Sequence, residues 1–290
     1  MSAPPQSSLF TAPQPIRNLF KLFPLHVHDT EALPARAPNR VRERARLHVF
    51  STEEDARLGR PSYNPGCLKW QTFLRIANLQ VDLVPSTNHA SPSGSLPYLL
   101  PSSSDSRPDI PLTGFHIANY AQKHSTQPLP PTENTPRQEA FLSLLGQNIR
   151  PAWLHFLYIN PRHTDLLSRL YLPPSAVLQY PLLQTLRAAA TTEILKATRR
   201  EIMLPELIYQ DAREAFKALS VFLGKESWFS GGETPGVFDA EVFAYTYLIS
   251  GGVMGWEDDA LERCLEGFVN LVEHQRRLYE MCWGEGQGSV

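Results

Sequence analysis

Cysteine is scarce in this chain, and its scarcity excludes two kinds of site. Only Cys67, Cys264 and Cys282 occur in 290 residues, and none belongs to a C-x-x-C pair. Three such positions cannot build a disulfide framework, and zinc ribbons and dithiol redox motifs need the missing pairs. The sequence therefore favours a reducing compartment.

The sequence also lacks an excess of charge of either sign. Its 27 Lys+Arg and 29 Asp+Glu give a net charge of −2. This balance gives no electrostatic reason to expect a nucleic-acid partner. At 42% hydrophobic residues the chain can bury a core, which excludes wholesale disorder.

No apolar run is long enough to suggest a membrane span. The best candidate, 242–256, is interrupted by Gly251 and Gly252 and followed by three acidic residues. It is shorter than the roughly 20 apolar residues that a span requires, so we predict a buried core helix. The first 15 residues contain four prolines and no positive charge, which argues against a secretory signal.

Proline, in contrast, is abundant and clustered. The chain has 26 prolines, with seven in the first 40 residues and four in 128–136, whereas average usage is about 5%. These clusters predict an N-terminal extension (1–44) and an interdomain linker (128–136). Two domains remain, 45–127 and 137–284, with a short tail at 285–290.

The extension carries two features that could dock on a partner. Residues 16–23 (IRNLFKLF) have helical spacing between Pro15 and Pro24, and five arginines lie within 36–46. The arginine run is either a solvated lead-in or a docking segment for an acidic partner or anionic lipid. A mitochondrial presequence would also be Arg-rich, although prolines and acidic residues interrupt this one. The candidate partner-binding residues are Leu19, Phe20, Leu22, Phe23, Arg36, Arg40, Arg42 and Arg44.

The first domain reads as β-α-β followed by a β-hairpin and a helix. Strands are predicted at 45–50, 80–84 and 95–100, with a tight turn after the third. The helix at 67–79 places four apolar residues on one face, and a short helix at 114–122 closes the domain. The four residues of that face are Trp70, Phe73, Leu74 and Ala77.

The second domain reads as all helix. Apolar residues recur every three or four positions over 141–156, 208–223 and 261–282, and Gly224 is a stop signal. Cys264 and Cys282 fall on the apolar stripe of the last helix, so we predict that both are small buried hydrophobic residues.

This layout resembles glutathione-transferase folds, an α+β thioredoxin-like domain followed by an all-α domain. Pro97 opens the third strand where such folds keep a cis-proline, which would free the backbone of the preceding residue for a ligand. The segment 229–249 resembles the helix start that nucleates the helical domain. Gly236 takes the cap position and Asp239 supplies the acidic half of a capping box.

Within that fold the chain resembles the metaxin family. The segment 91–100 (SPSGSLPYLL) closely matches the family's SPSG-x-x-P motif, and 67–79 and 229–245 are similar to its first helix and its helical-domain motif. The motif residues here are Ser91, Pro92, Ser93, Gly94 and Pro97. The likeness runs through about 45–284 and leaves the extension unexplained.

The metaxin resemblance implies a non-enzymatic, peripheral subunit on the cytosolic face of the mitochondrial outer membrane. Such a subunit belongs to the machinery that sorts and assembles β-barrel proteins. It would be held by the integral β-barrel subunit and by a second, membrane-anchored metaxin-like subunit, and would help to recognise β-barrel precursors. Because the sequence ends in MCWGEGQGSV without a span, it resembles the unanchored type, with indirect membrane contact and no cofactor.

Two alternatives belong to other functional classes. A glutathione transferase could use Cys67, because a thiol at a helix N-terminus has a lowered pKa. Transferases hold the γ-glutamyl group with an acidic residue followed by Ser or Thr, but Leu112 precedes Thr113 here, and Asp109 lies three residues too early. A cytosolic adaptor with a transferase-like fold is the other alternative.

Overall fold

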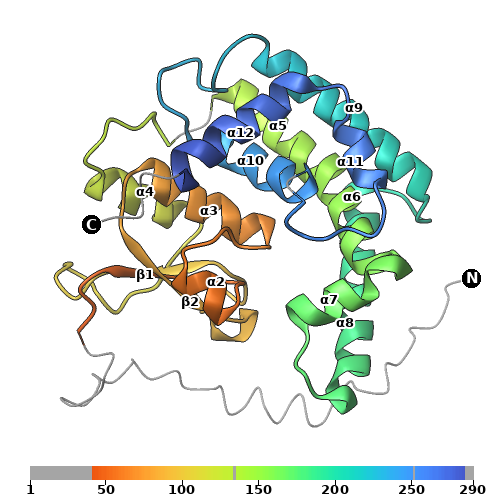
Figure 1. The fold of residues 1–290 in the computed structure, drawn as a ribbon, viewed down its shortest axis with the longest axis horizontal. Coiled ribbons are helices and arrows are strands. Elements are labelled where there is room, and N and C mark those ends of the chain that lie inside the picture. The colour runs from red at the N-terminus through yellow and green to blue at the C-terminus, as the bar shows by residue number, and fades with distance from the viewer. Residues whose placement is uncertain (1–40, 133–134, 251, 285–290) are drawn as a thin grey trace, which may run out of the picture. The chain divides into compact units, whose positions relative to one another are not determined.

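Four short strands form a mixed sheet in the first part of this computed structural model, which describes residues 41–132, 135–250 and 252–284 (Figure 1). They are β1 (Ala45–Val49), β2 (Val81–Pro85), β3 (Tyr98–Leu100) and β4 (Leu112–Thr113). The order is β2-β1-β3-β4, with β2 parallel to β1 and β3 antiparallel to both of its neighbours. The predicted β-α-β unit and hairpin are therefore confirmed.

Three helices accompany this sheet: α2 (Glu53–Arg57), α3 (Pro65–Ile76) and α4 (Phe115–His124). The Asn64 side chain accepts a hydrogen bond from the Cys67 backbone N–H at 3.2 Å, and Pro65 occupies the first helical position. These signals start α3 two residues earlier than predicted. Its predicted apolar face is buried: Trp70, Phe73, Leu74 and Ala77.

The connection between β3 and β4 contains the predicted tight turn but is longer than that turn alone. It is an eleven-residue loop, 101–111, fastened at two points by side chains from other elements. The buried Arg42 guanidinium donates to the carbonyl oxygens of Pro101 and Pro108 and pairs with Asp109 at 2.8 Å. Asp105 accepts hydrogen bonds from Tyr120 and His124 of α4. The tight turn predicted at the SSSDS run does form at the start of this loop, where the Asp105 backbone N–H donates to the carbonyl oxygen of Ser102 at 3.1 Å, but it does not by itself connect the two strands.

The second part of the chain is helical, as predicted. Its α-helices are α5 (Pro136–Leu144), α6 (Arg150–Leu154), α7 (Thr164–Tyr171), α8 (Ala176–Thr198), α9 (Pro205–Leu223), α10 (Val237–Ser250), α11 (Ala260–Leu265) and α12 (Val269–Trp283). Two π-helical turns, Leu145–Ile149 and His155–Ile159, flank α6 and extend the helix predicted at 141–156. Gly224 ends α9 with φ +59°, as its stop signal predicted.

The helix predicted at 261–282 is instead two helices, α11 and α12. Gly267 lies between them with φ +89°, a backbone conformation that L side chains rarely adopt and that a helix cannot contain. Cys264 and Cys282 are buried, as predicted. The core helix predicted at 242–256 is α10, which ends at Ser250. Over the described ranges no helix combines the length and apolarity needed to cross a membrane.

Helix α3 joins the sheet to the helical part of the chain (Figure 1). Its Lys69 pairs with Glu241 of α10, with 2.7 Å between Nζ and Oε2. Its Arg75 donates to the carbonyl oxygen of Cys282 at 2.6 Å, while Trp283 donates from Nε1 to the carbonyl oxygen of Gly59. Apart from Val41, all described residues fall in one compact unit, and these bonds show how its two parts are fastened.

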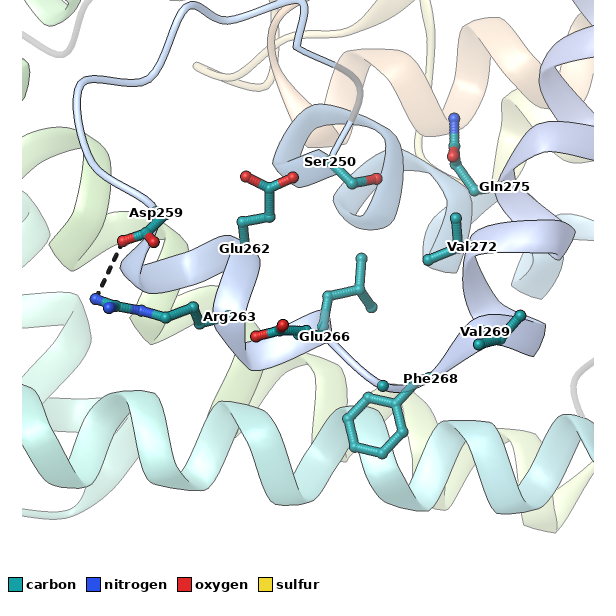
Figure 2. Close-up of a pocket in the computed structure, with 11 residues that line it drawn as sticks. Ser250, Asp259, Glu262, Arg263, Glu266, Phe268, Val269, Val272 and Gln275 are labelled. Carbon is teal, nitrogen blue, oxygen red and sulfur yellow. Dashed lines mark ion pairs between the residues drawn. The ribbon is translucent and has the colours of Figure 1, made fainter.

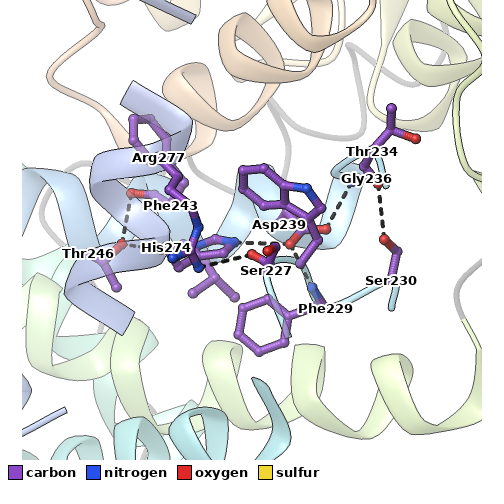
Figure 3. Close-up of polar contacts among 12 residues, drawn as sticks. Ser227, Phe229, Ser230, Thr234, Gly236, Asp239, Phe243, Thr246, His274 and Arg277 are labelled. Carbon is purple, nitrogen blue, oxygen red and sulfur yellow. Dashed lines mark hydrogen bonds and ion pairs between the residues drawn. The ribbon is translucent and has the colours of Figure 1, made fainter. Parts of the chain in front are cut away.

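A buried carboxylate holds the start of α10 (Figure 3). Asp239 accepts the backbone N–H of Gly236 at 2.9 Å on Oδ2 and that of Phe229 at 2.8 Å on Oδ1. Oδ1 also accepts from Nε2 of His274 in α12 at 3.0 Å, and both side chains are fully buried. One carboxylate therefore ties the 229–236 loop, α10 and α12 together.

Candidate functional site

The N-terminus of α3 is where a transferase-like thiol would act, and Cys67 lies there. Its side chain is completely buried, and its Sγ is 3.5 Å from the backbone nitrogen of Phe50, which donates to it. Burial raises the pKa of the Cys67 thiol to about 12, outweighing the hydrogen bonds from Phe50 and Ser62. The transferase alternative required a lowered pKa for this thiol, and that expectation is wrong, because burial raises it.

Aromatic side chains close the space over this helix start. The ring of Tyr171, from the end of α7, lies 5.0 Å from the ring of Phe50 and 5.4 Å from that of Tyr63. Tyr63 donates its hydroxyl to the carbonyl oxygen of Leu170 at 2.8 Å, and Asn64 donates its amide to the Tyr171 hydroxyl at 3.1 Å. Burial raises the pKa of Tyr171 well above its usual value. The helical part of the chain thus covers the N-terminus of α3 with protonated phenols.

The Leu96–Pro97 peptide bond is cis, at the start of β3. The backbone N–H of Leu96, which we expected to be free for a ligand, instead donates to Oδ1 of Asn88 at 3.0 Å. The expectation was wrong because Asn88, in the short 3₁₀ helix Asn88–Ala90, supplies an acceptor from within the chain. Nothing in the local sequence pattern marks Asn88 for this role.

The SPSG motif forms a turn that leads into the Leu96–Pro97 bond and β3. The Gly94 backbone N–H donates to the carbonyl oxygen of Ser91 at 3.0 Å, and Gly94 has φ +74°, which favours glycine. Ser91 is buried and its hydroxyl lies 3.1 Å from that of Ser93, whereas Pro92 is exposed. The motif therefore shapes the entry into β3.

The start of α4 is where a transferase would hold the γ-glutamyl group. Gly114 caps the helix with φ +52° and offers no side chain, and the half-buried Leu112 and Thr113 precede it. Asp109 does not reach this helix start with a free carboxylate, since it pairs with Arg42. A bound ammonium group would find no carboxylate at the position where a transferase supplies one.

Of the predicted docking residues, the structure describes two. Arg42 is buried and its guanidinium is used within the chain, as described above. Arg44 is exposed and lines a hollow of about 370 Å³ with Arg57 and Arg75. The other six lie outside the described residues, namely Leu19, Phe20, Leu22, Phe23, Arg36 and Arg40. Docking by this set stays a prediction.

A larger hollow of about 540 Å³ lies between α11, α12 and the end of α10 (Figure 2). Phe268, Val269 and Val272 give it apolar walls, and Val269 is 65% exposed. Glu262 and Glu266 add carboxylates to its rim, next to an ion pair of 3.1 Å between Asp259 and Arg263. Apolar walls with an acidic rim fit a basic, amphipathic protein segment better than a small anion. Sequence reasoning missed this hollow, because it arises at the break between α11 and α12.

The described residues contain no group of three His, Cys, Asp or Glu side chains placed to hold a metal ion. Residues 65–163 match the glutathione S-transferase N-terminal domain family, and residues 212–278 match the glutathione S-transferase C-terminal domain family. The chain therefore has transferase-like N- and C-terminal domains, and the predicted fold class is confirmed.

Metaxin-1 of Sus scrofa is similar to this chain, with 25% identity over 228 residues that cover 74% of this chain and 69% of that protein. Among solved structures, glutathione S-transferase III in its apo form is 13% identical, covers 81% of this chain and 91% of its own, and has a TM-score of 0.47. A β-etherase from Sphingobium sp. strain SYK-6 is 13% identical, with coverage of 81% and 98% and a TM-score of 0.48.

Proposed function

We propose that this chain is a non-enzymatic, metaxin-like peripheral subunit of the machinery that inserts β-barrel proteins into the mitochondrial outer membrane. The observation that carries the proposal is the 25% identity to Metaxin-1 over 228 residues, which cover 74% of a chain with two transferase-like domains. The SPSG motif at 91–94 and the helical-domain motif at 229–245 supply the local sequence likeness to the metaxin family.

In transferases the start of α3, the Leu96–Pro97 bond and the start of α4 would surround the ligand; together they are called the transferase corner here. In this chain the groups at all three places are buried, bonded or replaced, which supports a role without catalysis. Cys67 is buried, the Leu96 N–H is bound by Asn88, and Leu112 stands where an acidic residue would hold glutathione. A ligand would have to displace these contacts, and while they are in place the buried thiol is protonated at neutral pH. These contacts favour a fold used for protein contacts.

In this role the chain lies on the cytosolic side of the outer membrane and covers the mouth of the integral β-barrel subunit. A second, membrane-anchored metaxin-like subunit and the β-barrel precursors are its other partners. Its contribution is a binding surface and confinement of the precursor, with no covalent step. The hollow at α11 and α12 is one surface with the apolar and acidic character that a protein partner would recognise.

Purification of the tagged full chain from mitochondria in mild detergent tests the proposal. We expect an integral β-barrel protein in the eluate, release of the chain by alkaline carbonate, and loss of its membrane attachment when the barrel subunit is depleted. Recovery as a free cytosolic protein that turns over glutathione would refute the proposal. An active glutathione transferase serves as the control for the turnover assay.

Deletion of residues 1–41, which leaves the buried Arg42 and its bonds to the 101–111 loop in place, tests the docking role predicted for the extension. We expect weaker assembly with the barrel subunit while the body of the chain remains folded, as measured by its thermal unfolding. Full assembly of the shortened chain would assign docking to the body instead.

A further inference from the structure

The connection between α7 and α8 is unusual in its composition. Residues 170–186, here called the α7–α8 tip, contain no Asp, Glu, Lys, Arg or His in seventeen positions. Arg169 and Arg187 stand immediately on either side. Charged side chains make up 19% of the whole chain, so three would be expected in a segment of this length. Water-facing surface does not require such an absence, whereas burial in an apolar medium does.

Despite this composition most of the tip is exposed from Pro174 onward. Val177 is 84% exposed, Tyr180 71% and Leu178 51%. The C-terminal half of α8 is anchored, because Ala190 and Ile194 are buried against the rest of the helical domain. The tip is therefore the free end of a supported helix pair, which Figure 1 shows in green. Soluble monomers rarely leave such a continuous apolar surface without a use for it.

The distribution of exposure around α8 indicates what covers it. At about 100° per residue, the exposed positions Val177, Leu178, Tyr180, Pro181 and Leu182 span an arc of roughly 200°. Gln179 and Leu183, on the remaining side, are half-buried. A groove on a protein covers one face of a helix, commonly an arc nearer 100°. A fluid apolar medium covers a free end on every exposed side.

Two polar side chains of the tip, those of Gln179 and Thr185, are bonded within it, which lowers the cost of their leaving water. Gln179 donates from Nε2 to the carbonyl oxygen of Pro173 at 3.1 Å, and Thr185 donates from Oγ1 to that of Pro181 at 2.9 Å. Tyr180 has the amphipathic ring that is enriched where hydrocarbon meets headgroups. At the base of the pair, Arg162 and Arg169 are exposed and could reach lipid phosphates.

We propose that the α7–α8 tip inserts into the interfacial layer of a lipid bilayer. This gives the chain a direct membrane contact, in place of the purely indirect contact expected from its sequence. The insertion rests on the tip's own composition and exposure and does not depend on the proposed assembly role. It is shallow, because the exposed apolar end of α8 is short compared with a span.

Co-sedimentation of the full chain with phosphatidylcholine vesicles, with and without phosphatidylinositol, tests the proposal. We expect binding that the double variant Val177→Asp, Tyr180→Asp weakens by at least about tenfold, because two apolar contacts with lipid are lost. The matched control is Val221→Asp on α9, where the valine is 74% exposed outside the tip. All three side chains involved in the substitutions are at the surface, so unfolding midpoints should be unchanged.

Three results would overturn the proposal. The first is that the chain binds neither kind of vesicle. The second is that the double variant binds vesicles as well as wild type does, which would assign the binding to another part of the chain, such as the arginine-rich extension. The third is loss of mitochondrial attachment in the double variant without any vesicle binding by wild type, which would assign the tip to a protein partner. Because vesicles contain no protein, each result is distinct from failure to recover a β-barrel subunit.

Insertion depth provides an independent readout. A tryptophan introduced as Tyr180→Trp should shift its emission to the blue on addition of vesicles and be quenched by brominated lipid. Val221→Trp is the control and should show neither change. Quenching of both tryptophans to the same extent would contradict insertion through the tip.

Discussion

Replacement of Asp239 by alanine should destabilise the fold strongly, because the carboxylate accepts three hydrogen bonds without contact with water. Its partners are the backbone N–H groups of Gly236 and Phe229 and the Nε2 of His274. A hydrogen bond to a charged group contributes about 1.5–3 kcal/mol, and removal of one partner of a buried ionic network costs about 3–5 kcal/mol. We use the second range, since the three bonds share one carboxylate and are not additive.

The expected loss in the free energy of unfolding for Asp239→Ala is therefore about 3–5 kcal/mol. At roughly 2–4 °C per kcal/mol for a domain of this size, the unfolding midpoint should fall by about 6–20 °C. Asp239→Asn should cost less, about 1–3 kcal/mol, because one amide position places a donor against a backbone N–H while the oxygen still accepts. This second variant keeps the reasoning testable if the alanine variant does not fold.

Urea and thermal unfolding followed by far-ultraviolet circular dichroism measure these differences. Glu226→Gln is the matched control, because Glu226 is an exposed carboxylate just before the 229–236 loop and should change stability by less than about 0.5 kcal/mol. If Asp239→Ala unfolds within about 1 kcal/mol of wild type, the carboxylate does not fasten α10 to α12. A double-mutant cycle with His274→Phe measures how much of the loss in unfolding free energy comes from the Asp239–His274 interaction.

Three further predictions concern separate groups. Burial raises the Cys67 pKa to about 12, so Ellman's reagent should leave this thiol unlabelled near pH 8 until urea is added; rapid labelling of the native chain would contradict its burial. Burial lowers the His48 pKa from 6.5 to about 4; the unfolded chain therefore binds the proton more tightly, and native stability should fall as pH drops from about 6.5 to 4. His48→Phe should flatten the fall in unfolding midpoint over that range, and an unchanged pH profile would rule His48 out. Replacing Glu262 and Glu266 by lysine should reduce co-purification of the barrel subunit several-fold at an unchanged unfolding midpoint, whereas an unchanged yield would exclude this hollow from the interface.

Local signals explain which elements could be predicted from the sequence. Apolar periodicity located α3 and α9, and the Gly224 stop ended α9 correctly, because these signals act within a few residues. No helix was predicted for α7 or α8. The first half of α8 has apolar residues on all sides and a proline at 181, so it shows no helical period.

Contacts between distant residues limited prediction of the site. The position of Cys67 at a helix start was predictable, but the packing of Tyr171 against Phe50 and Tyr63 beside that helix start joins residues about a hundred positions apart. The acidic half of the capping box at Asp239 was visible in the sequence, whereas its partner His274 lies 35 positions away on another helix. Pairings across such separations leave no periodic trace in a single sequence.

The end of α7 links the closed transferase corner to the exposed α7–α8 tip. Leu170 and Tyr171 are bonded to Tyr63 and Asn64 beside α3, so the first two residues of the tip are fixed to the sheet domain. From Pro174 onward the exposed positions begin. A ligand that bound to Asn64 at the N-terminus of α3 would have to displace Tyr171 and, with it, one support of the tip. The bonds of Leu170 and Tyr171 beside α3 therefore help to hold the tip in its exposed position. Because the end of α7 serves both the covered start of α3 and the tip, this chain has a physical reason to keep the start of α3 covered.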